Sequence, residues 1–264
     1  MDNIGYWNVR GMNKLNKQLE IKRFIQLNNF SLFGILKTRI KNKNWGNVRS
    51  NVWNNWAICT NNSYHDGGRI WIVWNPNVYH LDIKDMSEQT IHLKVTDRGN
   101  LRQFWVTFVY GFNKLADRGK FWSSLRNYSL DVDEACLIGG DFNNVMFPNK
   151  RIGSEITLAE VKPFLDCNHD YKITNIKAIG SFFTWNNKQE VTTRVYSRID
   201  RDLINDDWLD AFPEAYAHFL TEGTFDHCQC VIHLDGPPRR KNFAFKYYNM
   251  WALAPAFQEI VEKS

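Results

Sequence analysis

The stretch from residue 135 to residue 144 constrains the fold more than any other part of the chain. Its first four residues are an apolar run typical of a buried strand, and two glycines end that run in a tight turn. The turn presents a carboxylate at Asp141 and a carboxamide at Asn143, which share one side if the local backbone stays extended. A carboxylate accepts a proton or holds a cation, and a carboxamide donates to a phosphate oxygen without adding charge. A plain polar turn is the alternative, because Gly-Asp and Asn-rich turns are common.

Polar residues of the same kind follow predicted strands along the whole chain. They are Asn8, Tyr110, Asp141, Asn143, Asp200, Asp226 and His227. Strands that alternate with helices and end in such groups predict one shared site at an edge of a sheet sandwich. The chemistry suits phosphodiester hydrolysis, which needs a nucleophilic water, stabilisation of the phosphoryl charge and help for the leaving oxygen.

Hydrophobic periodicity predicts the remaining elements. Strands are predicted at residues 3–8, 31–36, 56–60, 69–74, 78–84, 90–96, 103–110, 135–138, 215–220 and 230–234. Helices are predicted at 13–28, 114–128, 157–167, where Thr157 and Glu160 form a capping-box pattern, and 207–211. Residues 40–55 show no clear period and are predicted to be a loop. The turn signals at 66–68, 75–77 and 97–100 predict hairpins between neighbouring strands.

Composition bounds the class of protein. The chain has 264 residues, of which 44% are hydrophobic and 15% aromatic, so it can bury a substantial core. Its formal net charge of +5 is compatible with a polyanionic partner. An odd number of cysteines, five, with no CxxC pair argues against a disulfide framework and a structural zinc site, and favours thiols in a reducing compartment. No apolar run reaches membrane-spanning length, so we expect a soluble, intracellular protein.

Two regions are expected along the chain. Residues 1–236 are predicted to form one domain, and residues 237–264 a basic linker, a strand-like segment and the start of a C-terminal helix.

Five short motifs, in a fixed order along the chain, resemble those of a known protein superfamily. They are Trp7 to Gly11 (WNVRG), Val109 to Asn113 (VYGFN), Gly140 to Asn143 (GDFN), Ser197 to Arg201 (SRIDR) and Asp226-His227. The chain resembles the endonuclease/exonuclease/phosphatase superfamily, and is most similar to the endonuclease domain of plant LINE-type (non-LTR) retrotransposons. The segments 181–185 (SFFTW) and 245–251 (FKYYNMW) are similar to the versions found in those elements. The resemblance implies a four-layer α/β sandwich, with two mixed β-sheets face to face and helices outside.

The resemblance also implies roles for the residues that hold acid, amide and hydroxyl groups. Asp141 would orient or deprotonate the attacking water, with Asn143 and Asn8 gripping the phosphate. Tyr110 would offer its hydroxyl to a phosphate oxygen. Each has a plain structural alternative as well, such as an edge aromatic for Tyr110.

The remaining members of the implied site centre on a histidine. His227 would stabilise or protonate a phosphoryl oxygen, oriented by Asp200 through an imidazole–carboxylate bond. Asp226 would lie near a Mg²⁺ or Mn²⁺ ion. The alternatives are a loop histidine for His227, and for Asp200 an ion pair with Arg198 or Arg201.

One position departs from the pattern of the resembled family. The family places a glutamate, the main magnesium ligand, after the second strand, where this chain has Lys37. A hard divalent cation needs oxygen ligands, and an ammonium adds repulsion of about 4 kcal/mol at ~4 Å and an effective dielectric constant of about 20. We hypothesise that Lys37 pairs with Asp226 or Asp141 and closes the metal site. Arg10 matches the retroelement branch and not the apurinic endonucleases, which argues against abasic-site specificity.

The resemblance supports a metal-dependent endonuclease that nicks double-stranded DNA in the nucleus and leaves a 3′-hydroxyl, impaired in this copy by Lys37. A reverse transcriptase region normally accompanies such a domain. The alternative is an inactive relic that binds nucleic acid through surface residues; a small-phosphoester phosphatase is a third hypothesis. The expected nucleic-acid contacts are Arg10, Lys41, Lys43, Trp45 and Arg49.

Overall fold

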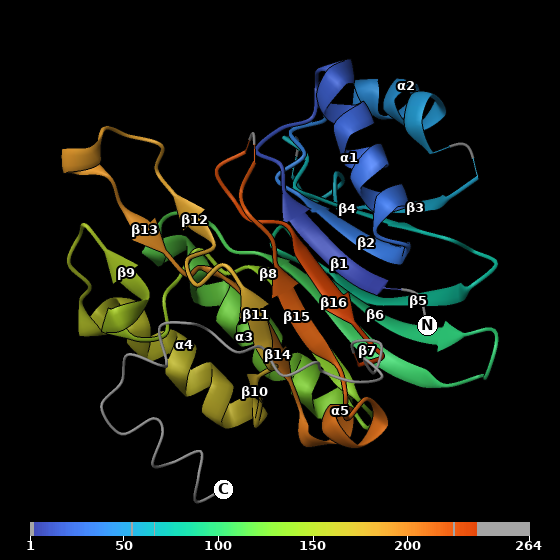
Figure 1. The fold of residues 1–264 in the computed structure, drawn as a ribbon. Helices are drawn as coiled ribbons and strands as arrows, with labels where there is room; N and C mark the ends of the chain where they lie inside the picture. The colour runs from blue at the N-terminus through green and yellow to red at the C-terminus, as the bar shows by residue number, and fades with distance from the viewer. Residues whose placement is uncertain (1–2, 54, 66, 224, 237–264) are drawn as a thin grey trace, which may run out of the picture.

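The computed structural model describes residues 3–53, 55–65, 67–223 and 225–236. Two large mixed sheets lie face to face in it, with helices on the outside (Figure 1). The predicted four-layer sandwich is therefore confirmed. The strand-like segment and helix predicted within residues 237–264 lie outside the described residues.

The first large sheet has seven strands. In spatial order they are β11 (Ala178–Gly180), β15 (Tyr216–Phe219), β16 (Cys230–His233), β1 (Asn3–Asn8), β2 (Phe30–Leu36), β4 (Ile70–Trp74) and β3 (Ala57–Thr60). Strand β1 pairs parallel with β2 and antiparallel with β16, which makes it a central strand. All but one of its residues are buried, as a strand covered on both faces requires.

The second large sheet has six strands. In spatial order they are β10 (Thr174–Asn175), β14 (Asp200–Ile204), β8 (Cys136–Asp141), β7 (Gln103–Tyr110), β6 (Thr90–Asp97) and β5 (Tyr79–Met86). A small third sheet joins β12 (Trp185–Asn186), β13 (Tyr196–Ser197) and β9 (Arg151–Ile152). Strand β8 pairs parallel with β7 and antiparallel with β14, so the stretch that begins at residue 135 lies in the middle of the six-stranded sheet.

Two helices cover the outer face of each large sheet. The helices are α1 (Leu15–Leu27), α2 (Asn42–Val52), α3 (Gly119–Asp131), α4 (Leu158–Tyr171) and the short α5 (Asp206–Ala211), with 3-10 turns η1 (Leu115–Arg118), η2 (Pro148–Lys150) and η3 (Val191–Thr193). Ile21 and Ile25 of α1 pack on the seven-stranded sheet, and aromatic residues of α3 and α4 pack on the six-stranded sheet. Thr157 caps α4 by accepting a hydrogen bond from the Glu160 amide, as predicted.

The main core lies between the sheets. It includes Leu32 and Leu36 from β2 and Val106 and Phe108 from β7, all essentially buried. Gly34 permits this close approach, because a Cβ there would collide with the ring of Phe108. The five cysteines are free thiols, four of them buried, as predicted. In the described part of the chain, no helix has the length and apolarity needed to cross a membrane.

Two predictions about the secondary structure and its connections are wrong. Residues 40–55 are not a loop, because α2 occupies most of them; among its residues 42–50 Val48 is buried and the others are exposed, so the helix has no broad apolar face. The turn at residues 75–77 is not a hairpin. It carries the chain from β4 in the seven-stranded sheet to β5 in the six-stranded sheet.

Candidate active site

Strand register brings three of the predicted site residues side by side. Asp141, the last residue of β8, is paired with Tyr110 at the end of β7 and with Asp200 at the start of β14. Asn8 ends β1 in the facing sheet. Its amide Nδ2 donates to Asp141 Oδ2 at 2.7 Å, so this hydrogen bond joins the two sheets at their common edge.

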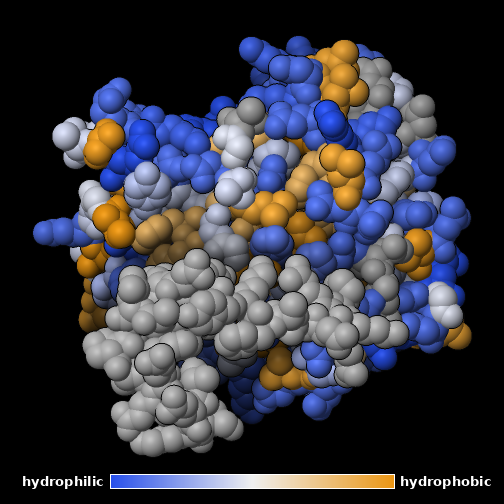
Figure 2. All heavy atoms as spheres, viewed as in Figure 1, coloured by the Kyte–Doolittle hydropathy of each residue, from blue (hydrophilic) through white to orange (hydrophobic). Residues whose placement is uncertain are grey.

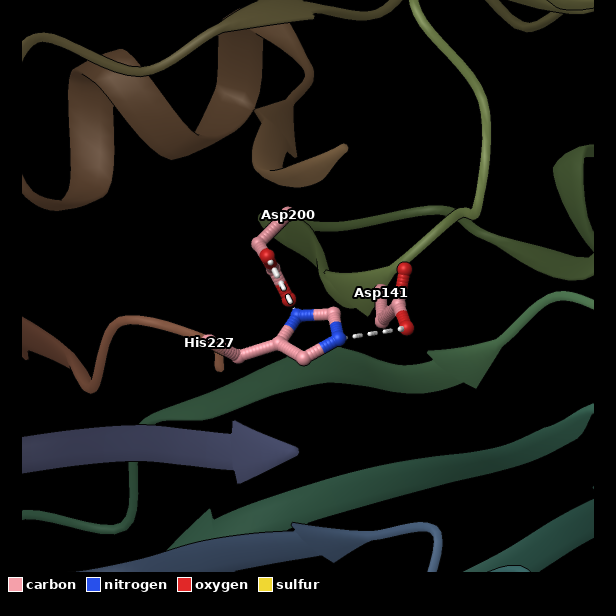
Figure 3. A group of neighbouring side chains, drawn as sticks. All are labelled: Asp141, Asp200 and His227. Carbon is pink, nitrogen blue, oxygen red and sulfur yellow. Dashed lines mark hydrogen bonds and ion pairs between the residues drawn. The ribbon is translucent and has the colours of Figure 1, made fainter. Parts of the chain in front are cut away.

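A chain of buried groups, joined by one hydrogen bond and one ion pair, runs through this edge (Figure 3). His227 Nδ1 lies 2.9 Å from Asp200 Oδ2, and its Nε2 lies 3.8 Å from Asp141 Oδ2 on the opposite side of the ring. Nε2 also lies 3.2 Å from Asn8 Nδ2. Asp141, Asp200 and Asn8 are fully buried and His227 is 3% exposed, so bulk water competes little with these contacts. The predicted Asp200–His227 pair is present.

The loop that carries His227 is fixed by backbone hydrogen bonds to the segment 184–186. The amide of Cys228 donates to the carbonyl of Thr184 at 2.8 Å, and the amide of Asn186 donates to that of Asp226 at 3.2 Å. The hydroxyl of Thr184 in turn accepts the amide of Asp200 at 2.9 Å. The SFFTW segment therefore holds both members of the histidine–aspartate pair in register.

Burial and mutual charge set the ionisation of this group. Burial opposes a charge on His227, but the carboxylates of Asp200 and Asp141 outweigh it and raise the pKa of the imidazole to about 9. Burial raises the pKa of Asp141 to about 6, although the positive charge of His227 opposes that rise. At neutral pH the arrangement thus favours an imidazolium between two carboxylates.

Three residues just beyond strand ends adopt the left-handed backbone conformation that non-glycine residues seldom take. They are Arg10 (φ 47°) after β1, Lys37 (φ 56°) after β2 and Asn143 (φ 49°) after β8. In Asn143 this conformation lets the backbone amide donate to Asp141 Oδ1 at 2.8 Å while the side chain donates to the Gly111 carbonyl at 2.6 Å. Such strain clusters at functional sites, where surrounding contacts maintain it.

A pocket of about 250 Å³ opens beside the buried chain of groups. Arg10, Lys37, Asn143, Asp226 and His227 line it, together with residues that sequence reasoning missed: Arg118, Arg151 and Trp185. Arg118 lies in η1 and donates to the Asn143 carbonyl at 2.8 Å. No strand-end pattern marks it, whereas Trp185 belongs to the SFFTW segment and was visible in the sequence without a role.

Asp226 has a partner other than the predicted one. Arg10 Nη1 lies 2.6 Å from Asp226 Oδ2, and Trp185 Nε1 donates to the same oxygen at 3.2 Å. The ammonium of Lys37 lies 5.4 Å from the centre of the Tyr110 ring instead. Within the described residues no ion pair of 4.0 Å or less joins Lys37 to Asp226 or Asp141, so the predicted pairing is wrong. Burial lowers the pKa of Lys37, and Asp141 opposes that shift.

Among the described residues, one group of side chains has the composition of a metal site. Asp141, Asp200 and His227 each offer an atom within 4.8 Å of the others, and such a buried acidic and imidazole group could bind a metal. However, His227 bonds Asp200, Asn8 and Asn143 bond Asp141, and Arg10 occupies Asp226. Mg²⁺ prefers free oxygen ligands, and the ammonium of Lys37 faces the same pocket. The residues as arranged therefore do not fit Mg²⁺.

The remaining predicted residues divide between the site and helix α2. Tyr110 is at the site, and its hydroxyl donates to Asn113 Oδ1 at 3.4 Å. Lys41, Lys43, Trp45 and Arg49 lie at and within α2, where the Arg49 guanidinium is 5.7 Å from the Trp45 ring. They do not line the pocket beside His227. Their contact with nucleic acid stays a prediction.

Part of the sequence is similar to a curated transposon protein. No model of a protein family matches the chain. An uncharacterised 149 kDa protein of transposon TX1 from Xenopus laevis is 26% identical over 168 residues, which are 60% of this chain. The match spans only 12% of that protein's length.

Solved structures match nearly the whole chain. The endonuclease domain of TRAS1, a telomere-specific non-LTR retrotransposon, has a TM-score of 0.66 and 12% identity, covering 92% of this chain and 100% of that one. The AP endonuclease LMAP of Leishmania major has a TM-score of 0.69 and 10% identity, covering 89% and 88%. An endonuclease/exonuclease/phosphatase family protein of Bacteroides thetaiotaomicron has a TM-score of 0.59 and 10% identity, covering 88% and 93%. The chain therefore has the fold shared by endonuclease/exonuclease/phosphatase proteins, and the resemblance read from its motifs is confirmed at the level of the fold.

Proposed function

We propose that the chain is a phosphodiester hydrolase of retrotransposon origin that acts on DNA, with its metal position altered by Lys37. One observation carries the proposal: Asn8, Asp141, Asp200 and His227, which are far apart in the sequence, form one buried cluster beside a cationic pocket, with hydrogen bonds between Asn8 and Asp141 and between His227 and Asp200. The similarity to a transposon protein and to a retrotransposon endonuclease domain supports the origin. A double-stranded DNA substrate would place the activity in the nucleus.

In the proposed reaction, a water oxygen attacks phosphorus and the P–O3′ bond breaks. The proton of that water passes to Asp141, which is ionised above its pKa of about 6. His227 stays protonated because of its neighbouring carboxylates and donates to a phosphoryl oxygen. The Asn143 amide and the Tyr110 hydroxyl hydrogen-bond the phosphate oxygens. The departing O3′ takes a proton from solvent and becomes the 3′-hydroxyl. A divalent ion such as Mg²⁺ or Mn²⁺ would supply further charge stabilisation if its ligand set were restored.

Lys37 favours a second function, that of an inactive relic which still binds nucleic acid. Its positive charge at the pocket discourages a divalent ion and attracts a phosphate. The hydrolase and the inactive relic would bind nucleic acid through the same surface, and only the hydrolase would cleave it.

Nicking of supercoiled plasmid tests the proposal. The protein as it stands is compared with Lys37→Glu, with Asp141→Asn in the Lys37→Glu background as the inactive control, each with and without Mg²⁺. We expect Lys37→Glu to nick at least about tenfold faster with Mg²⁺ and to bind Mg²⁺ measurably by calorimetry, because an attractive charge replaces a repulsive one. Equal Mg²⁺-dependent nicking by both proteins would show that Lys37 does not limit the metal. No nicking by either would leave the nucleic-acid-binding relic as the better account.

A further inference from the structure

A second pocket, of about 620 Å³, lies apart from the candidate active site. It shares no lining residue with the pocket beside His227. Three cations line it, Lys150 from η2 and Arg198 and Arg201 from the SRIDR motif, and we call it the Arg201 pocket. The active-site residues do not use these cations, and within the described chain no carboxylate lines the pocket.

Strand geometry explains why Arg201 points there. In β14 the side chains alternate, so Asp200 reaches His227 and Asp202 reaches Tyr6 on the inner face of the six-stranded sheet. Arg201 points to the outer face, where its guanidinium lies 6.0 Å from the ring of Phe164 on α4. Within the SRIDR motif, Asp200 therefore belongs to the active site, and the next residue, Arg201, belongs to the Arg201 pocket.

Arg201 is incompletely bonded although it is buried. Only 2% of it is exposed, and its Nη1 donates to Asn175 Oδ1 at 3.0 Å. Its Nε and Nη2 have no hydrogen-bond partner among the described residues. A buried donor without a partner is destabilising, more so when it is charged, so two on one guanidinium indicate a place for an acceptor.

The neighbouring cations make that acceptor an anion. Burial, and after it the charge of Arg198, lower the pKa of Arg201 to about 10. Burial lowers the pKa of Lys150 as well, with Arg198 and Arg201 adding to the shift. An incoming negative charge would stabilise these three neighbouring positive charges. A tetrahedral oxyanion with several acceptors suits a planar guanidinium and an ammonium.

The surroundings favour a nucleic-acid phosphate over an isolated ion. The ring of Phe182, which is 49% exposed, lies 4.4 Å from the ammonium of Lys150 and 5.9 Å from the guanidinium of Arg198. Phe147, 45% exposed, lines the pocket itself. Apolar and hydrophilic side chains adjoin on the face over β9 and β13 (Figure 2). Exposed rings next to cations are the features with which proteins bind unstacked bases and their phosphates.

We propose that the Arg201 pocket binds a phosphate group, supplied by the backbone of a nucleic-acid strand that also crosses the active site. The choice of source rests on the proposed function, whereas phosphate binding does not. Residues adjacent in sequence divide between the two pockets: Arg151 and Ser197 line the one beside His227, and Lys150 and Arg198 line the other. The strands β9 and β13 therefore separate two sites that one polyanion can contact together.

Calorimetric titration of the full chain with inorganic phosphate at low ionic strength tests the binding. We expect Lys150→Gln and Arg198→Gln each to weaken phosphate binding at least fivefold, because each removes one of three cations. Arg23→Gln on α1 removes one exposed charge outside the Arg201 pocket and is the matched control. Circular dichroism checks that each variant is folded. Binding that is absent from the parent protein, or equal in all four proteins, would overturn the proposal.

Fluorescence anisotropy with labelled single-stranded and double-stranded oligonucleotides separates the two sources. If the phosphate belongs to nucleic acid, Lys150→Gln lowers oligonucleotide affinity and reduces the slope of log affinity against log salt by about one unit more than Arg23→Gln does. If inorganic phosphate binding depends on Lys150 while oligonucleotide binding does not, the pocket takes a free phosphate, and the nucleic-acid source is overturned. Both readouts need no turnover, so they remain decisive even where no protein nicks plasmid.

Discussion

Asp141 shows how a single side chain is prepared by its neighbours. Its Oδ2 accepts from Asn8 of the opposite sheet, and its Oδ1 accepts from the amide of Asn143, so the carboxylate has one fixed orientation. Burial raises its pKa to about 6, which keeps it a competent proton acceptor at neutral pH. Orientation and basicity therefore arise from the same environment.

The ionisation of His227 gives a pH dependence of stability. Its pKa is raised to about 9 from 6.5, since Asp200 and Asp141 outweigh the opposing effect of burial. The folded state thus retains a proton that the unfolded chain releases, so this stabilisation is complete below pH 6.5 and is lost as the pH rises through 9. We expect the free energy of unfolding to fall by on the order of 3 kcal/mol over this interval, and His227→Gln to remove most of that fall. Urea denaturation at pH 6.5, 7.5 and 9 measures it; parallel profiles for the two proteins would contradict the assignment.

Residue types and their order predicted much of this site. Asn8 and Asp141 end strands and Asp200 begins one, whereas His227 lies in the loop before β16 and was found through its motif alone. The partner of Asp226 could not be predicted from the sequence. The choice between Arg10 and Lys37 depends on the side-chain directions of two residues with left-handed backbone conformation. Arg118 was missed because its contact with Asn143 arises from tertiary packing alone.

At the scale of elements, strands were predicted better than the polar helix. Strands such as β7 and β8 are buried on both faces and are apolar runs in the sequence, whereas in α2 Val48 is the buried position among residues 42–50 and the helix has no broad apolar face. The 75–77 turn contains residues common in hairpins, and whether such a turn returns to the same sheet or crosses to another is decided by distant pairing. The residues of the turn therefore do not predict which sheet the next strand joins.

Two glycines in different elements make a matched pair of substitutions. Gly140 in β8 has φ of +145°, and a Cβ there would collide with the carbonyl of Val109, whereas a Cβ on Gly46 in α2 would meet no atom within 4 Å. We expect Gly140→Ala to lower the free energy of unfolding by at least about 2 kcal/mol, and Gly46→Ala to raise it by about 0.5–1 kcal/mol through helix propensity. Chemical denaturation measures both. Similar effects from the two changes would refute the role given to backbone geometry.

At the scale of the whole molecule, the two large sheets depend on one core. Phe108 of β7 is 1% exposed and packs against Gly34 of β2 in the facing sheet. We expect Phe108→Ala to cost about 3–5 kcal/mol and to lower hydrogen-exchange protection in both sheets by the same amount, because the cavity lies between them. Loss of protection confined to the six-stranded sheet would show that the sheets unfold separately.

The pairing of β1 with β16 has a consequence for how this chain is made. Residues 4–6 of β1 lie beside residues 230–232 of β16, so the central strand of the seven-stranded sheet gains its second neighbour only when almost the entire described chain exists. On a ribosome, the earliest strand must wait with one edge unpaired while more than two hundred residues are synthesised. A chain of this topology therefore folds late and needs protection of its first strand during synthesis, whatever follows it in the same translation product.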